Sequence, residues 1–234
     1  MTSPENTGQL ITIRTTTRIL PPSSSRPPTT TPHLLLRPLA ASDLEAFYAL
    51  RRQQEVMQWT TSGRIDENKE DTATRLAVSL PPNDTQTFNC AICLRGTGEL
   101  VGVGGVLRVT GEKLTFGWPE VGYMLRREVW GKGFATEFLR AFLVMWEELP
   151  REVVERRVDV SSLVRRVEDG AAESVPEELI ATIDGTNGAS QRVLEKCGFQ
   201  KFLVFEEADT HDPERMKESV AYRYLPQDKT VGAR

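Results

Sequence analysis

The sequence predicts an α+β domain in which helices flank a mixed, mostly antiparallel central sheet of about seven strands. Two observations carry this prediction. The elements read along the chain are a strand, two helices, three strands, a helix, a strand, a helix and two strands. A doubly wound nucleotide-binding fold needs strict alternation of strands and helices, and neither that alternation nor a G-x-G-x-x-G or P-loop spacing occurs.

The composition narrows the range of partners. The 234 residues carry 29 basic and 33 acidic side chains, a formal net charge of −4, which argues against a bulk electrostatic grip on nucleic acid. No apolar run is long enough for a membrane span, and the 3 cysteines and 2 histidines leave little for metal binding. We therefore expect no metal, no nucleic acid or membrane partner, and a cytoplasmic location.

Residues 1–30 are rich in Ser, Thr and Pro and precede a domain expected to span residues 31–228. Such a segment buries little apolar surface, so we expect a flexible arm. Its arginines and its scarcity of acids also fit a mitochondrial transit peptide, which leaves a mitochondrial location as the alternative. The prolines favour a plain tail or a wrapping arm, because they interrupt an amphipathic helix.

The first half of the domain has clear local signals. Residues 33–37 read as a strand, and a helix follows in which Ser42 and Glu45 have capping-box spacing. A second helix is expected over residues 66–80 with Asp66 as its cap. Residues 87–109 read as two strands around a glycine turn, and residues 118–127 as another strand. Cys90 and Cys93 lie three apart on a strand and face opposite sides, which argues against a zinc or redox site.

The second half begins with a helix whose predicted core face is Phe138, Leu139, Phe142, Leu143 and Trp146. Residues 147–178 are densely charged and look inserted, so we expect one amphipathic helix and a connector, together a solvated flap. A last helix is expected between Asn187, a candidate cap, and Gly198, a candidate left-handed terminator. Strands near residues 201–206 and 219–225 close the domain.

Gly131, Lys132 and Gly133 stand directly before the third helix. A helix start leaves backbone N–H groups unpaired and carries a partial positive charge. Glycines let a ligand approach the backbone, and a lysine adds charge, so the turn suits a pyrophosphate. The same residues also suit a tight turn without a ligand.

The flanking sequence resembles the GNAT superfamily of acetyl-CoA-dependent N-acetyltransferases, within it the branch that contains the ribosomal-protein amino-terminal acetyltransferases. The resemblance covers about residues 31–206 outside the insert and rests on "HLLLRPLAASDL", "ELVGVGGV", "PEVGYMLRREVWGKGFATEFL" and "NGASQRVLEKCGF". It implies the GNAT fold, acetyl-CoA as cosubstrate, and a small-molecule amine or a protein N-terminus as acceptor. It leaves an oligomer open.

The resemblance also implies which residues hold acetyl-CoA. Backbone N–H groups of the turn would bind the pyrophosphate, from Gly131, Lys132, Gly133, Phe134, Ala135 and Thr136. The strand with Met124 and Leu125 would pair with the pantetheine arm, and an N–H near Met124 would face the thioester oxygen. Arg126 and Arg127 would meet phosphates or else lie in a solvated loop. Asn187 would bond the pantetheine, cap its helix, or do both.

Two residues are implied in proton transfer. Glu120 would take the proton of the amine, unless it is a surface glutamate. Many relatives carry a tyrosine seven residues after the asparagine, but this chain has Leu194 there, so Ser190 becomes the candidate donor to the leaving thiolate. The implied reaction is direct attack of a primary amine on acetyl-CoA. The alternative is a catalytically silent domain that binds CoA or a protein partner, which the missing tyrosine and the charged insert favour.

Overall fold

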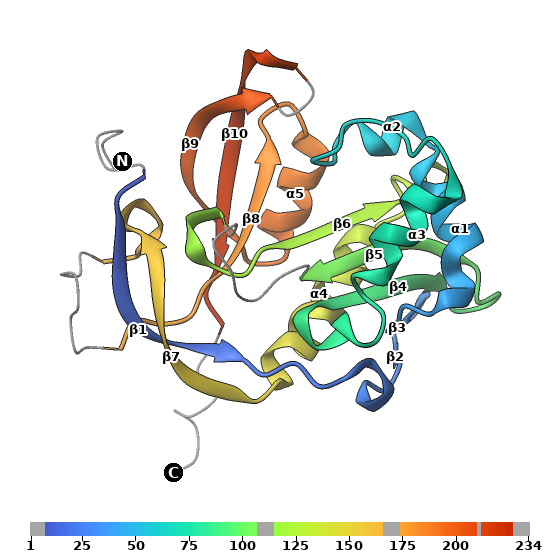
Figure 1. Cartoon of the computed structure of the whole chain (residues 1–234), viewed down its shortest axis with the longest axis horizontal. Coiled ribbons are helices and arrows are strands. Elements are labelled where there is room, and N and C mark those ends of the chain that lie inside the picture. The colour runs from blue at the N-terminus through green and yellow to red at the C-terminus, as the bar shows by residue number, and fades with distance from the viewer. Residues whose placement is uncertain (1–7, 107–114, 166–173, 210–211, 227–234) are drawn as a thin grey trace.

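Figure 1 shows the computed structural model, which describes residues 8–106, 115–165, 174–209 and 212–226. The helices are α1 (Leu44–Arg51), α2 (Gln54–Met57), α3 (Lys69–Ala77), α4 (Phe134–Glu148) and α5 (Gly188–Lys196). The strands are β1 (Leu10–Arg18), β2 (Thr29–Thr30), β3 (Leu34–Pro38), β4 (Phe88–Leu94), β5 (Leu100–Val106), β6 (Val121–Leu125), β7 (Arg151–Asp159), β8 (Leu179–Asp184), β9 (Gln200–Asp209) and β10 (Asp212–Tyr224). The predicted mixed α+β fold with antiparallel sheets is confirmed.

The strands form a five-stranded sheet in the order β2-β3-β4-β5-β6, a three-stranded sheet β8-β10-β9 and a two-stranded sheet β1-β7, all antiparallel. The two larger sheets touch where an isolated parallel bridge joins Glu120 to Ile180, with the Ile180 N–H donating to Pro119 O at 2.9 Å. Beyond that bridge β6 and β8 share no ladder within the described residues. The two strands therefore diverge from one joined end.

Helices cover both faces of the five-stranded sheet, with α4 and α5 on one side and α1 to α3 on the other (Figure 1). The buried residues of α4 are Phe138, Leu139, Phe142, Leu143 and Trp146, the predicted core face. Cys90 packs into the core under α4 while Cys93 packs into the core under α1 and α3, so the two thiols face opposite sides as predicted.

The structure corrects the expected flexible arm over residues 10–18 and the expected helix of the insert. β1 pairs with β7 along its whole length, from Leu10 opposite Asp159 to Arg18 opposite Arg151. The sequence of β1 is rich in β-branched residues, and Ile11 and Ile13 are buried. The two strands are more than 130 residues apart in the sequence, so no local pattern in either segment predicts that they pair. Residues 1–7 and 166–173 of the expected arm and insert lie outside the described residues.

Asp66 was expected to cap the second helix, but Asn68 does so, accepting from the Asp71 N–H at 2.9 Å. Asp66 instead belongs to the loop from α2 to α3, with its side chain buried. Its carboxylate accepts from Arg51 Nε at 2.6 Å and from Thr72 Oγ1 at 2.6 Å. Burial alone would raise the pKa of this carboxyl, but the bonds from Arg51 and Thr72 hold the pKa below its usual value.

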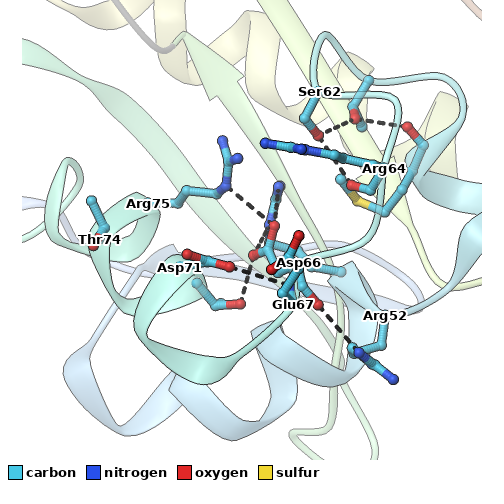
Figure 2. A network of polar contacts seen from close by, with 12 residues as sticks. Arg52, Ser62, Arg64, Asp66, Glu67, Asp71, Thr74 and Arg75 are labelled. Atoms are coloured by element: carbon cyan, nitrogen blue, oxygen red, sulfur yellow. Dashed lines mark hydrogen bonds and ion pairs between the residues drawn. The ribbon is translucent and has the colours of Figure 1, made fainter. Parts of the chain in front are cut away.

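Figure 2 shows how this buried carboxylate fixes the loop. Arg75 reaches Asp66 Oδ1 from α3 at 3.3 Å, and Arg52 donates to the Asp66 carbonyl at 3.3 Å. Ser62 stabilises the middle of the loop through the Thr60 hydroxyl at 3.1 Å. The loop is thus attached to the end of α1 and to α3. None of the helices in the described ranges has the length and apolarity that a membrane-spanning helix needs.

Candidate functional site

A cleft of about 450 Å³ opens where β6 and β8 diverge. One wall comes from the turn before α4 and from α5, and the other includes Val56, Trp59 and Thr60 from α2 and the loop after it. Residues of β6 and β8 line it between these walls: Val121, Gly122, Tyr123, Met124, Leu125, Ala181, Thr182, Ile183 and Asp184. The joined ends of the two strands close the cleft at the level of Glu120.

The turn before α4 has the geometry of an anion site. Gly131 and Gly133 have left-handed φ angles of 73° and 82°, and no atom lies within 4 Å of a Cβ built on either one. Gly133 is the N-cap of α4 and offers no side chain to the first N–H groups of the helix. Phe134, Ala135 and Thr136 also line the cleft, whereas Lys132 does not. The glycines therefore keep open a space beside the start of α4, whose first N–H groups have no partner within the helix.

The start of α5 forms the rest of the wall to which the turn before α4 belongs. Asn187 caps the helix, its Oδ1 accepting from the Ser190 N–H at 3.1 Å, and both residues line the cleft. The sequence-predicted capping role is confirmed, and Gly198 ends the helix with a φ of 88°. An asparagine that accepts with its oxygen still has an NH₂ group to donate.

Arg126 and Arg127, expected near phosphates, are engaged elsewhere. Arg126 Nη1 pairs with Glu99 at 2.7 Å, and Arg127 Nη1 pairs with Glu55 at 2.6 Å. Neither residue lines the cleft. Glu99 on the β4–β5 turn and Glu55 on α2 bind these guanidinium groups. The sequence around position 126 does not reveal these two ion pairs, because their carboxylates come from distant parts of the chain.

Arg192 and Lys196 of α5 are the cationic side chains among the described lining residues of the cleft. The sequence analysis missed both. They stand four residues apart on the helix that Asn187 caps, a spacing that puts them on one helical face. The spacing of these two cations along the helix was the sequence signal for a phosphate-binding face, but a solvent-exposed helix face gives the same spacing.

Glu120 lies at the closed end, where its Oε1 accepts from the Thr182 N–H at 3.1 Å. It is half-buried and is not itself among the residues that line the cleft. The structure therefore brings Asn187, Ser190, Met124, Leu125 and the glycine turn together around one cavity. Glu120 lies at the closed end of the cavity without lining it, and Arg126 and Arg127 lie outside.

Two buried polar atoms of cleft residues have no hydrogen-bond partner within the described part of the chain: the Tyr123 hydroxyl and Thr182 Oγ1. Burial raises the pKa of Tyr123 to about 12, and a hydrogen-bonding interaction with the Ser190 side chain opposes that rise. Buried polar groups almost always have partners, so Thr182 Oγ1 indicates a missing one, whereas the Ser190 side chain is the candidate partner of the Tyr123 hydroxyl. The sequence offered no signal for either, since both look like ordinary strand residues.

Comparison with known proteins agrees with this geometry. Residues 33–200 match the family model described as an acetyltransferase (GNAT) domain. A GNAT-family acetyltransferase structure from Bacillus anthracis is similar at 20% identity, over 86% of this chain and 100% of that one, with a TM-score of 0.61. A putative ribosomal-protein-serine acetyltransferase from Vibrio cholerae is similar at 18% identity, over 85% and 97% of the two chains, with a TM-score of 0.57.

A third similar structure is the microcin C7 self-immunity acetyltransferase MccE in complex with acetyl-CoA and AMP, at 15% identity, over 83% of this chain and 93% of that one, with a TM-score of 0.60. At these identities the structural likeness establishes the fold. Among curated proteins none matches this sequence. Because the family model spans most of the chain, this protein belongs to the GNAT acetyltransferase family.

Proposed function

We propose that this chain transfers the acetyl group of acetyl-CoA to a primary amine, which attacks the thioester directly. The observation that carries the proposal is the cleft between β6 and β8, which opens beside the uncapped start of α4. The edge of β6 that faces β8 has no ladder there in the described residues, so it offers backbone groups to an amide-rich arm, and a helix start offers N–H donors to a pyrophosphate. Acetyl-CoA has both parts in one linear molecule.

On the side that we name the cofactor wall, residues 131–136 and α5, each residue has a proposed role. Backbone N–H groups of the turn bind the pyrophosphate, and Lys132 adds positive charge near its mouth. Asn187 bonds the pantetheine arm, and Arg192 and Lys196 bind phosphate. The N–H near Met124 stabilises negative charge on the thioester oxygen. Ser190 donates to the leaving sulfur.

The acceptor amine occupies the other side, which we name the acceptor wall: Gly122, Thr182 and residues 56–60. Tyr123 packs with the core under α4 and α5, so the alternation of a strand turns Gly122 and Met124 to the opposite face. No atom lies within 4 Å of a Cβ built on Gly122, which leaves room for a substrate. Thr182 Oγ1 is an unused polar atom on the neighbouring strand.

Glu120 is the proposed proton acceptor. Its carboxylate accepts from the N–H of Thr182, a residue of the acceptor wall, and this bond fixes it at the closed end of the cleft. A water molecule between the amine and this carboxylate would complete the path. A general base of this kind contributes about a hundred- to ten-thousandfold in rate.

A panel of amine acceptors tests the proposal. Peptides with different N-termini, single amino acids, aromatic amines and polyamines are incubated with acetyl-CoA, and both free CoA and the acetylated product are measured. We expect at least one acceptor to gain one acetyl group per CoA released, and Gly133→Val to show neither signal. If CoA binds but no acceptor across the panel is acetylated, the catalytically silent alternative holds.

A further inference from the structure

Tyr123 has no role in the proposed acetyl transfer so far, and a role for it rests on that proposed function. Tyr123 projects from β6 toward α5, and its ring packs on Phe138 at 6.1 Å between centroids. Its hydroxyl is buried and makes no well-aligned hydrogen bond in the described residues, although the Ser190 side chain interacts with it, and the residue lines the cleft. Leu194, where many relatives have a tyrosine, is buried in the same core.

Ser190 lies on the same side of the cleft. It is in the first turn of α5, fixed through its N–H by Asn187, and it lines the cavity together with Tyr123. The Ser190 side chain is near enough to influence the ionisation of the tyrosine. A serine hydroxyl has one hydrogen to donate and rotates freely, so its direction depends on what donates to its oxygen.

We propose that Tyr123 is a positioning residue, whose hydroxyl donates to Ser190 Oγ and thereby turns the Ser190 hydrogen toward the sulfur of CoA. When the amine displaces the thiolate, the C–S bond breaks and sulfur keeps the electron pair. The hydrogen bond from Ser190 stabilises that thiolate. Both hydroxyls keep their protons, and the thiolate takes its proton from solvent on release.

The surroundings of Tyr123 suit a donor that never ionises. Burial raises the pKa of this phenol to about 12, so it remains an O–H donor throughout the neutral range. The described charged side chains that line the cleft are Asp184 from β8 and Arg192 and Lys196 from α5. The Asp184 carboxylate accepts from the Thr186 N–H at 2.9 Å. The Cys197 thiol is near Tyr123, and burial raises its pKa, so it stays neutral as well.

The test is the pKa of the CoA thiol when CoA is bound, followed by thiolate absorbance, with the same titration of desulfo-CoA subtracted. This readout needs neither an acceptor nor turnover. A hydrogen bond to a charged group is strong enough that we expect Tyr123→Phe to raise the bound thiol pKa by about one unit. Ser190→Ala should raise it at least as much. The double variant should match Ser190→Ala, because the tyrosine acts through the serine.

Tyr222→Phe is the matched control. Its hydroxyl also reaches α5, bonding Gln191 at 3.3 Å and Glu195 at 3.2 Å, but the residue does not line the cleft. It should titrate as wild type. A wild-type thiol pKa in Tyr123→Phe with CoA bound would overturn the inference, and so would an unchanged value in Ser190→Ala. Failure of wild type to bind CoA at all would overturn the proposed function itself, a distinct result.

Discussion

The two walls of the cleft differ in how the chain builds them. The cofactor wall comes from two short, continuous stretches, the glycine turn before α4 and the first turns of α5. The acceptor wall is assembled from Val56, Trp59, Gly122 and Thr182, which lie on three separate parts of the chain. A binding site made of backbone groups and helix starts therefore depends on residues that are close together in the sequence. A surface that selects a substrate depends on long-range packing, here including the bonds of the buried Asp66 in the α2–α3 loop to Arg51 and Thr72.

The largest expected effect falls on the cofactor wall. Gly133→Val should abolish acetyl-CoA binding in a folded protein, because a branched side chain strains a left-handed residue and fills the space at the start of α4. Calorimetric titration with acetyl-CoA measures this. Gly98→Val is the matched control, since Gly98 likewise has a left-handed φ, 73° against 82° for Gly133, and open surroundings but lies on the β4–β5 turn. Equal affinity in the two folded variants would reduce Gly133 to a turn residue.

The next effect concerns Glu120, at the joined end of the strands. Glu120→Gln should retain acetyl-CoA affinity and lose about a hundred- to ten-thousandfold in turnover, the usual range for a general base. Part of the rate should return at high pH, where the amine loses its proton to solvent. Ser190→Ala should slow the reaction with less recovery at high pH, because it acts on the leaving sulfur. Full activity of Glu120→Gln across pH would remove Glu120 from the mechanism.

The acceptor wall is tested at Gly122. Gly122→Val should raise the KM for the acceptor by about tenfold or more while the affinity for acetyl-CoA stays within twofold, because the new side chain enters open space on the face opposite Tyr123. Steady-state kinetics with the best acceptor of the panel separates the two constants. If acetyl-CoA affinity falls instead, Gly122 belongs to the cofactor wall and the division of the cleft is wrong.

The smallest expected effect, on acetyl-CoA affinity, distinguishes the cations of α5 from the arginines at the end of β6. Arg192→Gln and Lys196→Gln should each weaken acetyl-CoA binding by about tenfold at low salt, the size of one charge-assisted hydrogen bond, and by less at high salt. Arg126→Gln is the control, because its guanidinium pairs with Glu99 outside the cleft. A larger loss in the Arg126 variant than in both α5 variants would restore the sequence-based prediction at the strand end.

The features that the sequence predicted are those that depend on residues close together in the chain. The helical pattern of α4, the cap at Asn187 and the glycine turn depend on neighbours within a few residues, so the sequence predicted them. The β1–β7 pairing, the capture of Arg126 by Glu99 and the unpartnered Tyr123 hydroxyl depend on contacts between distant segments. Composition even pointed the wrong way for β1, because the Ser, Thr and Pro that suggest a flexible arm include the β-branched threonines of a strand.

Thermal melting with and without acetyl-CoA tests the central claim most directly, since both walls have meaning only if this cleft binds the cosubstrate. At about a hundredfold excess over the dissociation constant, linkage predicts roughly 2–3 kcal/mol of added stability, or about 5–10 °C in Tm for a chain of this size. We expect this rise in Tm for wild type and for Gly98→Val, and no rise for Gly133→Val. No shift in wild type at millimolar acetyl-CoA would contradict it.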